Sequence, residues 1–148
     1  MKKLFLVTLL LFGLVTLFGC NEKPEVDGSF DFIIYESDSD NSDLTDNKIV
    51  AKYTISYVGC QTVTDTLIKK DGKYYFSEES NDYLVLTDSG YGLSYTQGYF
   101  ANYSECASGA IDVSWSYTAV NGAASTVGIG ETPLDGLNEY GFVINGWK

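Results

Sequence analysis

The sequence predicts an all-β fold, and three observations support that prediction. Hydrophobic and polar residues alternate with a period of two along several stretches, which is the pattern of strands with one buried face. The dipeptides Asp71-Gly72 and Asn121-Gly122 interrupt such stretches and favour tight hairpin turns. The sequence has no clear hydrophobic stripe with the 3.6-residue period of a helix. We therefore expect a single domain, an antiparallel β-barrel or β-sandwich of about eight to nine strands.

The first strands are expected in the order in which the alternating stretches occur. The chain should form a strand near residues 30–36, and residues 49–57 alternate along their whole length. Asp71-Gly72 then separates a strand near 62–70 from one near 73–77, as the two halves of a hairpin.

The second half of the chain follows the same pattern. The clearest strand spans residues 111–119, where hydrophobic side chains occupy every second position. Asn121-Gly122 connects it to a return strand at 123–129. Because the polar positions of 111–119 form one complete face, we expect this strand to have one side in water. Further strands are expected near residues 83–87, 92–96 and 140–147.

The first nineteen residues have the layout of a secretory signal peptide. Lys2 and Lys3 precede an uncharged stretch from Leu4 to Gly19. As a helix this stretch would cover roughly 24 Å, which is less than the ~30 Å hydrocarbon core of a bilayer. The sequence therefore favours an export signal over a permanent transmembrane anchor.

This stretch closes on "LFGC", which ends at Cys20 and resembles the lipobox of bacterial lipoproteins. The resemblance implies that the chain is cut before Cys20 and that a diacylglycerol on its sulfur binds the membrane. Asn21 then implies a cell-envelope location at the outer membrane. An uncleaved anchor, or a free thiol at Cys20, is the alternative. The expected organisation is a signal peptide at 1–19, a lipidated flexible tether at 20–29 and an all-β domain at 30–148.

Three cysteines are an odd number for an exported protein. If Cys20 carries the lipid, Cys60 and Cys106 remain as an even pair in an oxidising compartment. A disulfide between them would close a loop of about 46 residues and stabilise the fold by roughly 4 kcal/mol in the chain-entropy model. Two separate buried thiols are the alternative.

The charge and composition of the chain exclude several functional classes. The net charge is −11, and cleavage before Cys20 would remove Lys2 and Lys3 and make it −13. Nucleic acids need clustered basic residues, so we expect no nucleic-acid partner, whereas a basic protein would suit an acidic surface. The chain has no histidine, which excludes Ser-His-Asp triads and the usual zinc sites. We therefore expect a binding protein and not an enzyme.

The segment "YESDSDNSDLTDNK" contains the densest group of carboxylates, beginning at Glu36. Calcium takes six to eight oxygen ligands, and one acidic loop could supply several of them. The segment lacks the glycine of an EF-hand, and a solvated connection between two strands is the alternative. No other cofactor is expected. The candidate calcium ligands are Asp38, Asp40, Asp43 and Asp46.

The segment "YGLSYTQGYFANYS" places tyrosines at four-residue intervals, among glycines that disfavour a helix. Exposed tyrosines there could stack on sugar rings or cover the mouth of a barrel. A buried position in the core or at a sheet edge is the alternative. The candidate ligand-binding residues are Tyr91, Tyr95, Tyr99 and Tyr103.

The segment "CASGAIDVSWSYTAVNG", with Cys106 and Trp115, is similar to the late strand of small bacterial lipocalin-like lipoproteins. The chain has Phe30 where that family usually has tryptophan on its first strand. The resemblance implies a lipocalin-like barrel that holds a small apolar or aromatic ligand. Two other functions fit the sequence: an acidic inhibitor or interaction module for a basic protein such as a lysozyme, and a surface adhesin that binds carbohydrate.

Overall fold

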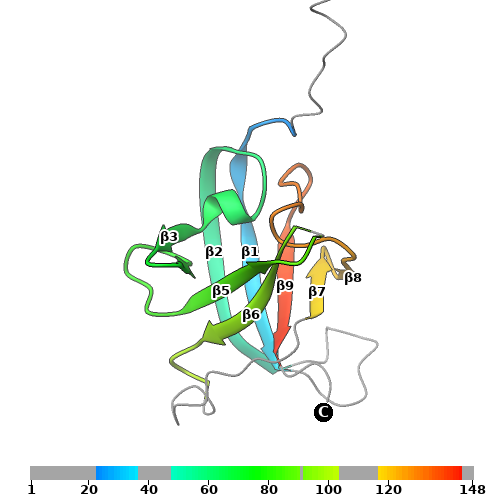
Figure 1. Cartoon of the computed structure of the whole chain (residues 1–148). Coiled ribbons are helices and arrows are strands. Elements are labelled where there is room, and N and C mark those ends of the chain that lie inside the picture. The colour runs from blue at the N-terminus through cyan, green and yellow to red at the C-terminus, as the bar shows by residue number, and fades with distance from the viewer. Residues whose placement is uncertain (1–22, 37–47, 91, 104–116, 145–148) are drawn as a thin grey trace, which may run out of the picture.

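The computed structural model describes residues 23–36, 48–90, 92–103 and 117–144, and this part of the chain is all-β. The all-β prediction is therefore confirmed. The described strands form a five-stranded and a four-stranded sheet and do not close into one barrel (Figure 1). Of the strand predicted at 111–119, residues 111–116 lie outside the described residues. Of the strand predicted at 140–147, residues 145–147 lie outside them.

The five-stranded sheet has the strand order β2-β1-β9-β7-β8. Its longest pair is β1 with β2, which run antiparallel with Gly28 opposite Tyr57 and Glu36 opposite Lys48. Asn121 and Gly122 have φ angles of 50° and 81° and join β7 to β8, as a tight hairpin turn requires. The strands are β1 (Val26–Glu36), β2 (Lys48–Cys60), β7 (Tyr117–Val120), β8 (Ala123–Ala124) and β9 (Glu139–Ile144).

One pair in this sheet is parallel, so the prediction of a purely antiparallel fold is wrong here. Asp31 lies opposite Glu139, and Glu36 lies opposite Ile144, in the pairing of β1 with β9. After β8 the chain returns through residues 125–138, and β9 enters the sheet between β1 and β7. All of β9 after Glu139 is buried, as expected for a central strand with both faces covered.

The four-stranded sheet is an antiparallel meander, with the strands in chain order. Asp71 and Gly72 have φ angles of 49° and 76°, and the pairing of Lys70 with Lys73 confirms the hairpin predicted around them. The strands are β3 (Ile68–Lys70), β4 (Lys73–Tyr75), β5 (Tyr83–Asp88) and β6 (Leu93–Tyr99).

Several predicted strand boundaries are wrong. The strand predicted at 123–129 ends already at Ala124, and the strand predicted at 73–77 ends at Tyr75. The strand predicted at 62–70 begins only at Ile68, because a 3₁₀ turn, η2 (Thr64–Thr66), precedes it. The Asp65 carboxylate accepts the backbone N–H groups of Thr62, at 2.8 Å, and Gln61, at 3.2 Å, and such side-chain bonds compete with strand pairing. At the N-terminus, Val26 is already in β1 opposite Cys60, so the expected tether at 20–29 includes four residues of a strand.

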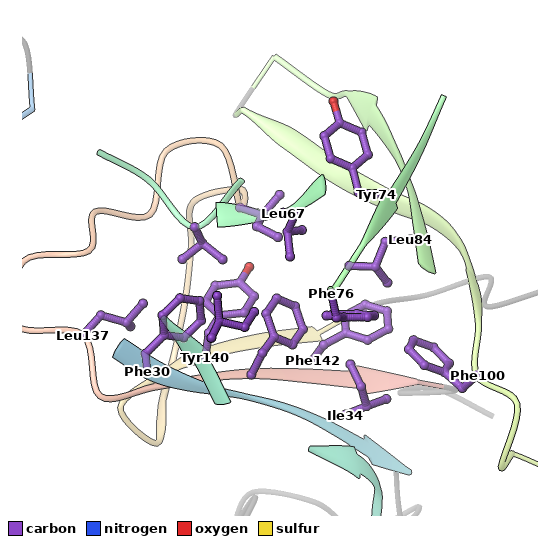
Figure 2. Packing of buried hydrophobic residues seen from close by; sticks show 14 of the residues in the cluster. Phe30, Ile34, Leu67, Tyr74, Phe76, Leu84, Phe100, Leu137, Tyr140 and Phe142 are labelled. Atoms are coloured by element: carbon purple, nitrogen blue, oxygen red, sulfur yellow. The ribbon is translucent and has the colours of Figure 1, made fainter. Parts of the chain in front are cut away.

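The larger hydrophobic core lies between the two sheets and contains side chains from both (Figure 2). A smaller cluster of Ile33, Tyr35 and Val143 is formed by β1 and β9 alone. Phe76 is at the centre of the larger core: its ring centroid lies 5.0 Å from that of Phe32 and 4.3 Å from that of Tyr53. Each such side chain contributes about 1.5–3 kcal/mol when fully buried. Because the side chains that fill the core are large, are buried and come from both sheets, their burial stabilises the packing of one sheet on the other. The fully buried members include Phe32, Ile34, Leu84, Phe100, Ile129, Leu134, Tyr140 and Phe142.

Candidate functional site: a tyrosine row on the four-stranded sheet

The outer face of the four-stranded sheet carries three tyrosines in one line across adjacent strands. Tyr75 of β4 lies opposite Tyr83 of β5, and Tyr83 lies opposite Tyr99 of β6. Side chains that lie directly opposite each other project from the same face of a sheet. We call Tyr75, Tyr83 and Tyr99 the tyrosine row; Ile68 of β3, opposite Tyr75, extends it to the edge of the sheet.

The sequence neighbours of the row point into the core, which places the row on the opposite face. Tyr74, Leu84 and Phe100 each stand next to a row residue, and they are 8%, 0% and 0% exposed. All three belong to the core cluster; in Figure 2, Leu84 and Phe100 lie beside the other core side chains, and Tyr74 lies at the edge of the cluster. The row tyrosines themselves are only partly buried. Alternation thus sets a core residue beside a surface tyrosine on β4 and β5, and Phe100 stands in the same relation to Tyr99 directly after β6.

The rings of the row contact one another. Both centroid separations, from Tyr75 to Tyr83 and from Tyr83 to Tyr99, are 5.6 Å. The interplanar angle is 53° for the first pair and 18° for the second. These separations lie within the 4.5–7 Å range in which aromatic pairs attract. The three rings therefore form a continuous aromatic strip that is anchored on rigid strands.

A lysine stands beside the central ring. Lys73 is two residues before Tyr75 on β4, so both side chains lie on the same face. Its Nζ atom is 4.4 Å from the ring centroid of Tyr83, which is the geometry of a cation–π contact. The site therefore combines an aromatic surface with hydroxyl groups and one ammonium group.

A buried carboxylate ties together the strand ends that carry Tyr83 and Tyr99. Asp82 is 7% exposed, and its Oδ1 accepts the backbone N–H of Ala101 at 2.8 Å. Its Oδ2 accepts the hydroxyl of Tyr53 from β2 in the other sheet. The pKa of Tyr53 is raised, mainly because the hydroxyl is buried and secondly because it donates this hydrogen bond to Asp82. Asp82 thus fixes the start of β5 against the residues after β6 and fixes both against the five-stranded sheet.

The structure separates the tyrosines that the sequence grouped by spacing. Tyr99 is in the row, but Tyr103 is 5% exposed and belongs to the core, so it is not available to a ligand. Tyr95 lies on β6, and Tyr91 lies outside the described residues. The reason is that residues four apart along a strand are not neighbours, whereas residues opposite each other on adjacent strands are.

Sequence reasoning missed Tyr75 and Tyr83. The signal for part of the row was present, because the Asp71-Gly72 turn fixes the register of its hairpin and so places Ile68 opposite Tyr75. The pairing of Tyr83 with both neighbours depends on the longer connections before and after β5, and no turn motif specifies their register.

The predicted calcium ligands Asp38, Asp40, Asp43 and Asp46 lie outside the described residues. Glu36, at the start of that segment, forms an exposed ion pair with Lys48 at 3.2 Å. Within the described ranges, no three carboxylate or cysteine side chains come together in a way that could hold a metal ion. The calcium site stays a prediction.

Cys60 lies at the end of β2 and has no disulfide partner among the described residues. Its pKa is raised, first by burial and then by the nearby charge of Asp65, so the thiol form is favoured over the thiolate. Its predicted partner Cys106, like Cys20, lies outside the described residues. The disulfide and the lipid attachment therefore stay predictions.

A recess of about 370 Å³ lies near η2 and the start of β6. Its lining includes the side chains of Asp65, Asp88 and Glu131, with Leu93 on one side. Glu131 also accepts, through its backbone carbonyl, a hydrogen bond from Lys23 at 2.5 Å. A ligand that fills this recess would have to desolvate these carboxylates unless it offers them a cation or hydrogen-bond donors.

In the part of the chain that the structure describes, no helix has the length and hydrophobicity needed to cross a bilayer. Comparisons of the chain with known protein families, with curated proteins and with solved structures found no match.

Proposed function

We propose that this chain is a lipid-anchored protein of the bacterial cell envelope that binds carbohydrate, without catalysis, at the tyrosine row. The observation that carries the proposal is the alignment of three part-exposed rings on adjacent strands. Sugar rings present faces of C–H groups and edges of hydroxyl groups, and a tyrosine offers an apolar ring and a hydroxyl to match. An extended oligosaccharide would cross β4, β5 and β6 and meet one tyrosine on each strand.

Rigidity supports this role. Each row tyrosine stands on a hydrogen-bonded strand, and the rings limit one another through contacts at 5.6 Å. Little side-chain freedom remains to be lost when a ligand binds, which favours affinity. The Asp82 hydrogen bond to the backbone of Ala101 stabilises the arrangement from the core side.

The core favours a surface site over an internal one. A small apolar ligand in a lipocalin-like barrel would need an enclosed cavity, whereas large buried side chains fill the space between the described sheets. Two sheets that share one core also support the sandwich alternative over the barrel. The inhibitor alternative depended on the acidic segment 36–46, of which the structure describes only Glu36.

Membrane anchoring would strengthen a weak sugar site. Single aromatic–sugar contacts contribute little, but many anchored copies that bind one polysaccharide gain from a high effective concentration. The proposed lipid on Cys20 would thus allow many copies, each with a low-affinity tyrosine row, to bind one polysaccharide stably.

The test is binding of the purified full chain to a panel of immobilised polysaccharides, both neutral and acidic. We expect Tyr83→Ala to weaken binding to the recognised polysaccharide at least about tenfold, or ~1.4 kcal/mol, because it removes the central ring. Tyr83→Phe retains the ring and should keep most of the affinity. Thermal melting checks that both variants are folded. The proposal fails if no polysaccharide binds, or if folded Tyr83→Ala binds as well as the natural sequence.

A further inference from the structure

We propose that the carbohydrate recognised at the tyrosine row is acidic, carrying carboxylate or sulfate groups, and that Lys73 contacts the charged group. This inference rests on the proposed function and adds the ligand class to it. It follows from the distribution of charge over the two sheets and from the surroundings of one ammonium group.

Positive charge is concentrated on the sheet that carries the row. The whole chain has 20 acidic residues against 9 basic ones. Strands β3 to β6 reverse this ratio, since they carry Lys69, Lys70 and Lys73 but, of acidic residues, only Asp88 at the end of β5. Alternation from Ile68 and Tyr75 places Lys70 and Lys73 on the outer face with the row.

Of the two described lysines on this face, Lys73 is the one whose charge has no carboxylate partner. Lys70 already forms an ion pair with Glu78, and Lys69 lies over the ring of Tyr74 at 5.3 Å, on the core side of the sheet. Lys73 forms no ion pair with any carboxylate of the described residues. Its Nζ lies 4.4 Å from the Tyr83 centroid, and a ring face does not neutralise a charge as a carboxylate does.

The net negative charge of the protein does not prevent this recognition at physiological ionic strength. The Debye length is then about 8 Å, so charges elsewhere on the molecule are largely screened from a ligand on the row. The groups within that distance decide the sign of the interaction. A negatively charged substituent beside Tyr83 would form a charge-assisted hydrogen bond with Lys73, while its sugar ring rests on the tyrosines.

The experiment compares polymers that differ only in charge. One pair is polygalacturonate and its fully methyl-esterified, uncharged form; the other is dextran sulfate and dextran. We expect the full chain to bind at least one acidic polymer several-fold more tightly than its neutral partner at physiological salt. The two pairs distinguish a carboxylate from a sulfate. Lys73→Gln should remove the preference, and Lys48→Gln, which alters an exposed lysine on the other sheet, should leave it unchanged.

The outcomes separate the inference from the proposed function. Equal binding within both pairs, with Tyr83→Ala still reducing it, overturns the acidic ligand and keeps the carbohydrate site. A preference for acidic polymers that survives in Lys73→Gln overturns the role of Lys73. Absence of binding to these polymers and to every other polysaccharide of the panel contradicts the proposed function itself.

Discussion

Asp82 shows how much of this fold depends on one buried carboxylate. It is 7% exposed and accepts hydrogen bonds from a backbone N–H beyond β6 and from the Tyr53 hydroxyl on β2. A buried carboxylate oxygen without a hydrogen-bond donor destabilises the folded state, because it loses its hydrogen bonds to water and forms none in the protein. The hydroxyl of Tyr53 therefore stabilises the fold by donating a hydrogen bond to Asp82, although the ring of Tyr53 packs among hydrophobic residues.

We expect Tyr53→Phe to lower the free energy of unfolding by about 1–3 kcal/mol, because the Asp82 oxygen that it serves stays buried without a partner. Chemical denaturation followed by tyrosine and tryptophan fluorescence measures the change.

Tyr57→Phe is the matched control for Tyr53→Phe. Tyr57 lies on the same strand, and its hydroxyl forms no hydrogen bond within the described residues, so its removal should change stability by less than about 0.5 kcal/mol. Equal changes in the free energy of unfolding for the two substitutions would show that the hydrogen bond from Tyr53 to Asp82 does not stabilise the fold.

The hairpin between β7 and β8 also fixes the entry of β9. Asn121 has a φ angle of 50°, and its Oδ1 accepts the backbone N–H groups of Asn138, at 2.8 Å, and Glu139, at 3.0 Å. Its Nδ2 donates to the carbonyl of Gly136 at 3.0 Å. A turn residue thus positions the first residue of the central strand.

We expect Asn121→Ala to destabilise the protein by about 2–3 kcal/mol, since it removes these hydrogen bonds and places alanine at a positive φ. Asp71→Ala is the control, because Asp71 has a similar φ of 49° and makes no side-chain hydrogen bond in the described chain. It should cost only about 1 kcal/mol. Thermal melting of both variants tests this. A similar loss of stability in the two variants would show that the side-chain hydrogen bonds of Asn121 do not stabilise the start of β9.

The sequence predicted those features of the fold that local chemistry determines. Asp71-Gly72 and Asn121-Gly122 were identified as hairpins because few residue pairs tolerate two successive positive φ angles. The parallel pairing of β1 with β9 was missed, because alternation shows which face of a strand is buried but not which strand lies beside it. The turn at Thr64 was missed because the bonds accepted by Asp65 override the strand pattern around it.

The candidate site was predictable only in part, for the same reason. The carbohydrate alternative and Tyr99 came from the sequence, because tyrosines clustered among glycines are visible along the chain. Tyr75 and Tyr83 join Tyr99 only through cross-strand register. The contact of Lys73 with Tyr83 is a diagonal one between strands, and the sequence gives no sign of it.

At the scale of the whole molecule, the proposed anchor determines how far the domain stands from the membrane. β1 begins at Val26, six residues after Cys20, and six extended residues span at most ~20 Å. The domain would therefore stay close to the lipid surface, with the β1 start nearest to it. The tyrosine row lies on β4 to β6, away from that end of β1 (Figure 1).

We expect Cys20→Ser to move the protein out of the membrane fraction, because the acyl chains would supply its membrane affinity and an acidic domain gains none from anionic headgroups. Fractionation of cells that express the natural and substituted chains, with intact mass to detect the lipid, measures this. A natural chain without added lipid mass would contradict the anchor. Retention of Cys20→Ser in washed membranes would instead indicate an uncleaved hydrophobic segment.

The position of β9 has a consequence for when the protein can fold. The last strand of the described residues, β9, lies in the middle of the five-stranded sheet, between β1 and β7. The described sheet is incomplete until β9 has joined it, and the pairing of β1 with β9 joins residues about one hundred positions apart. Such long-range pairing makes folding slow. The proposed export through a membrane would require the chain to stay unfolded until it has crossed, and this strand order would delay its folding for that time.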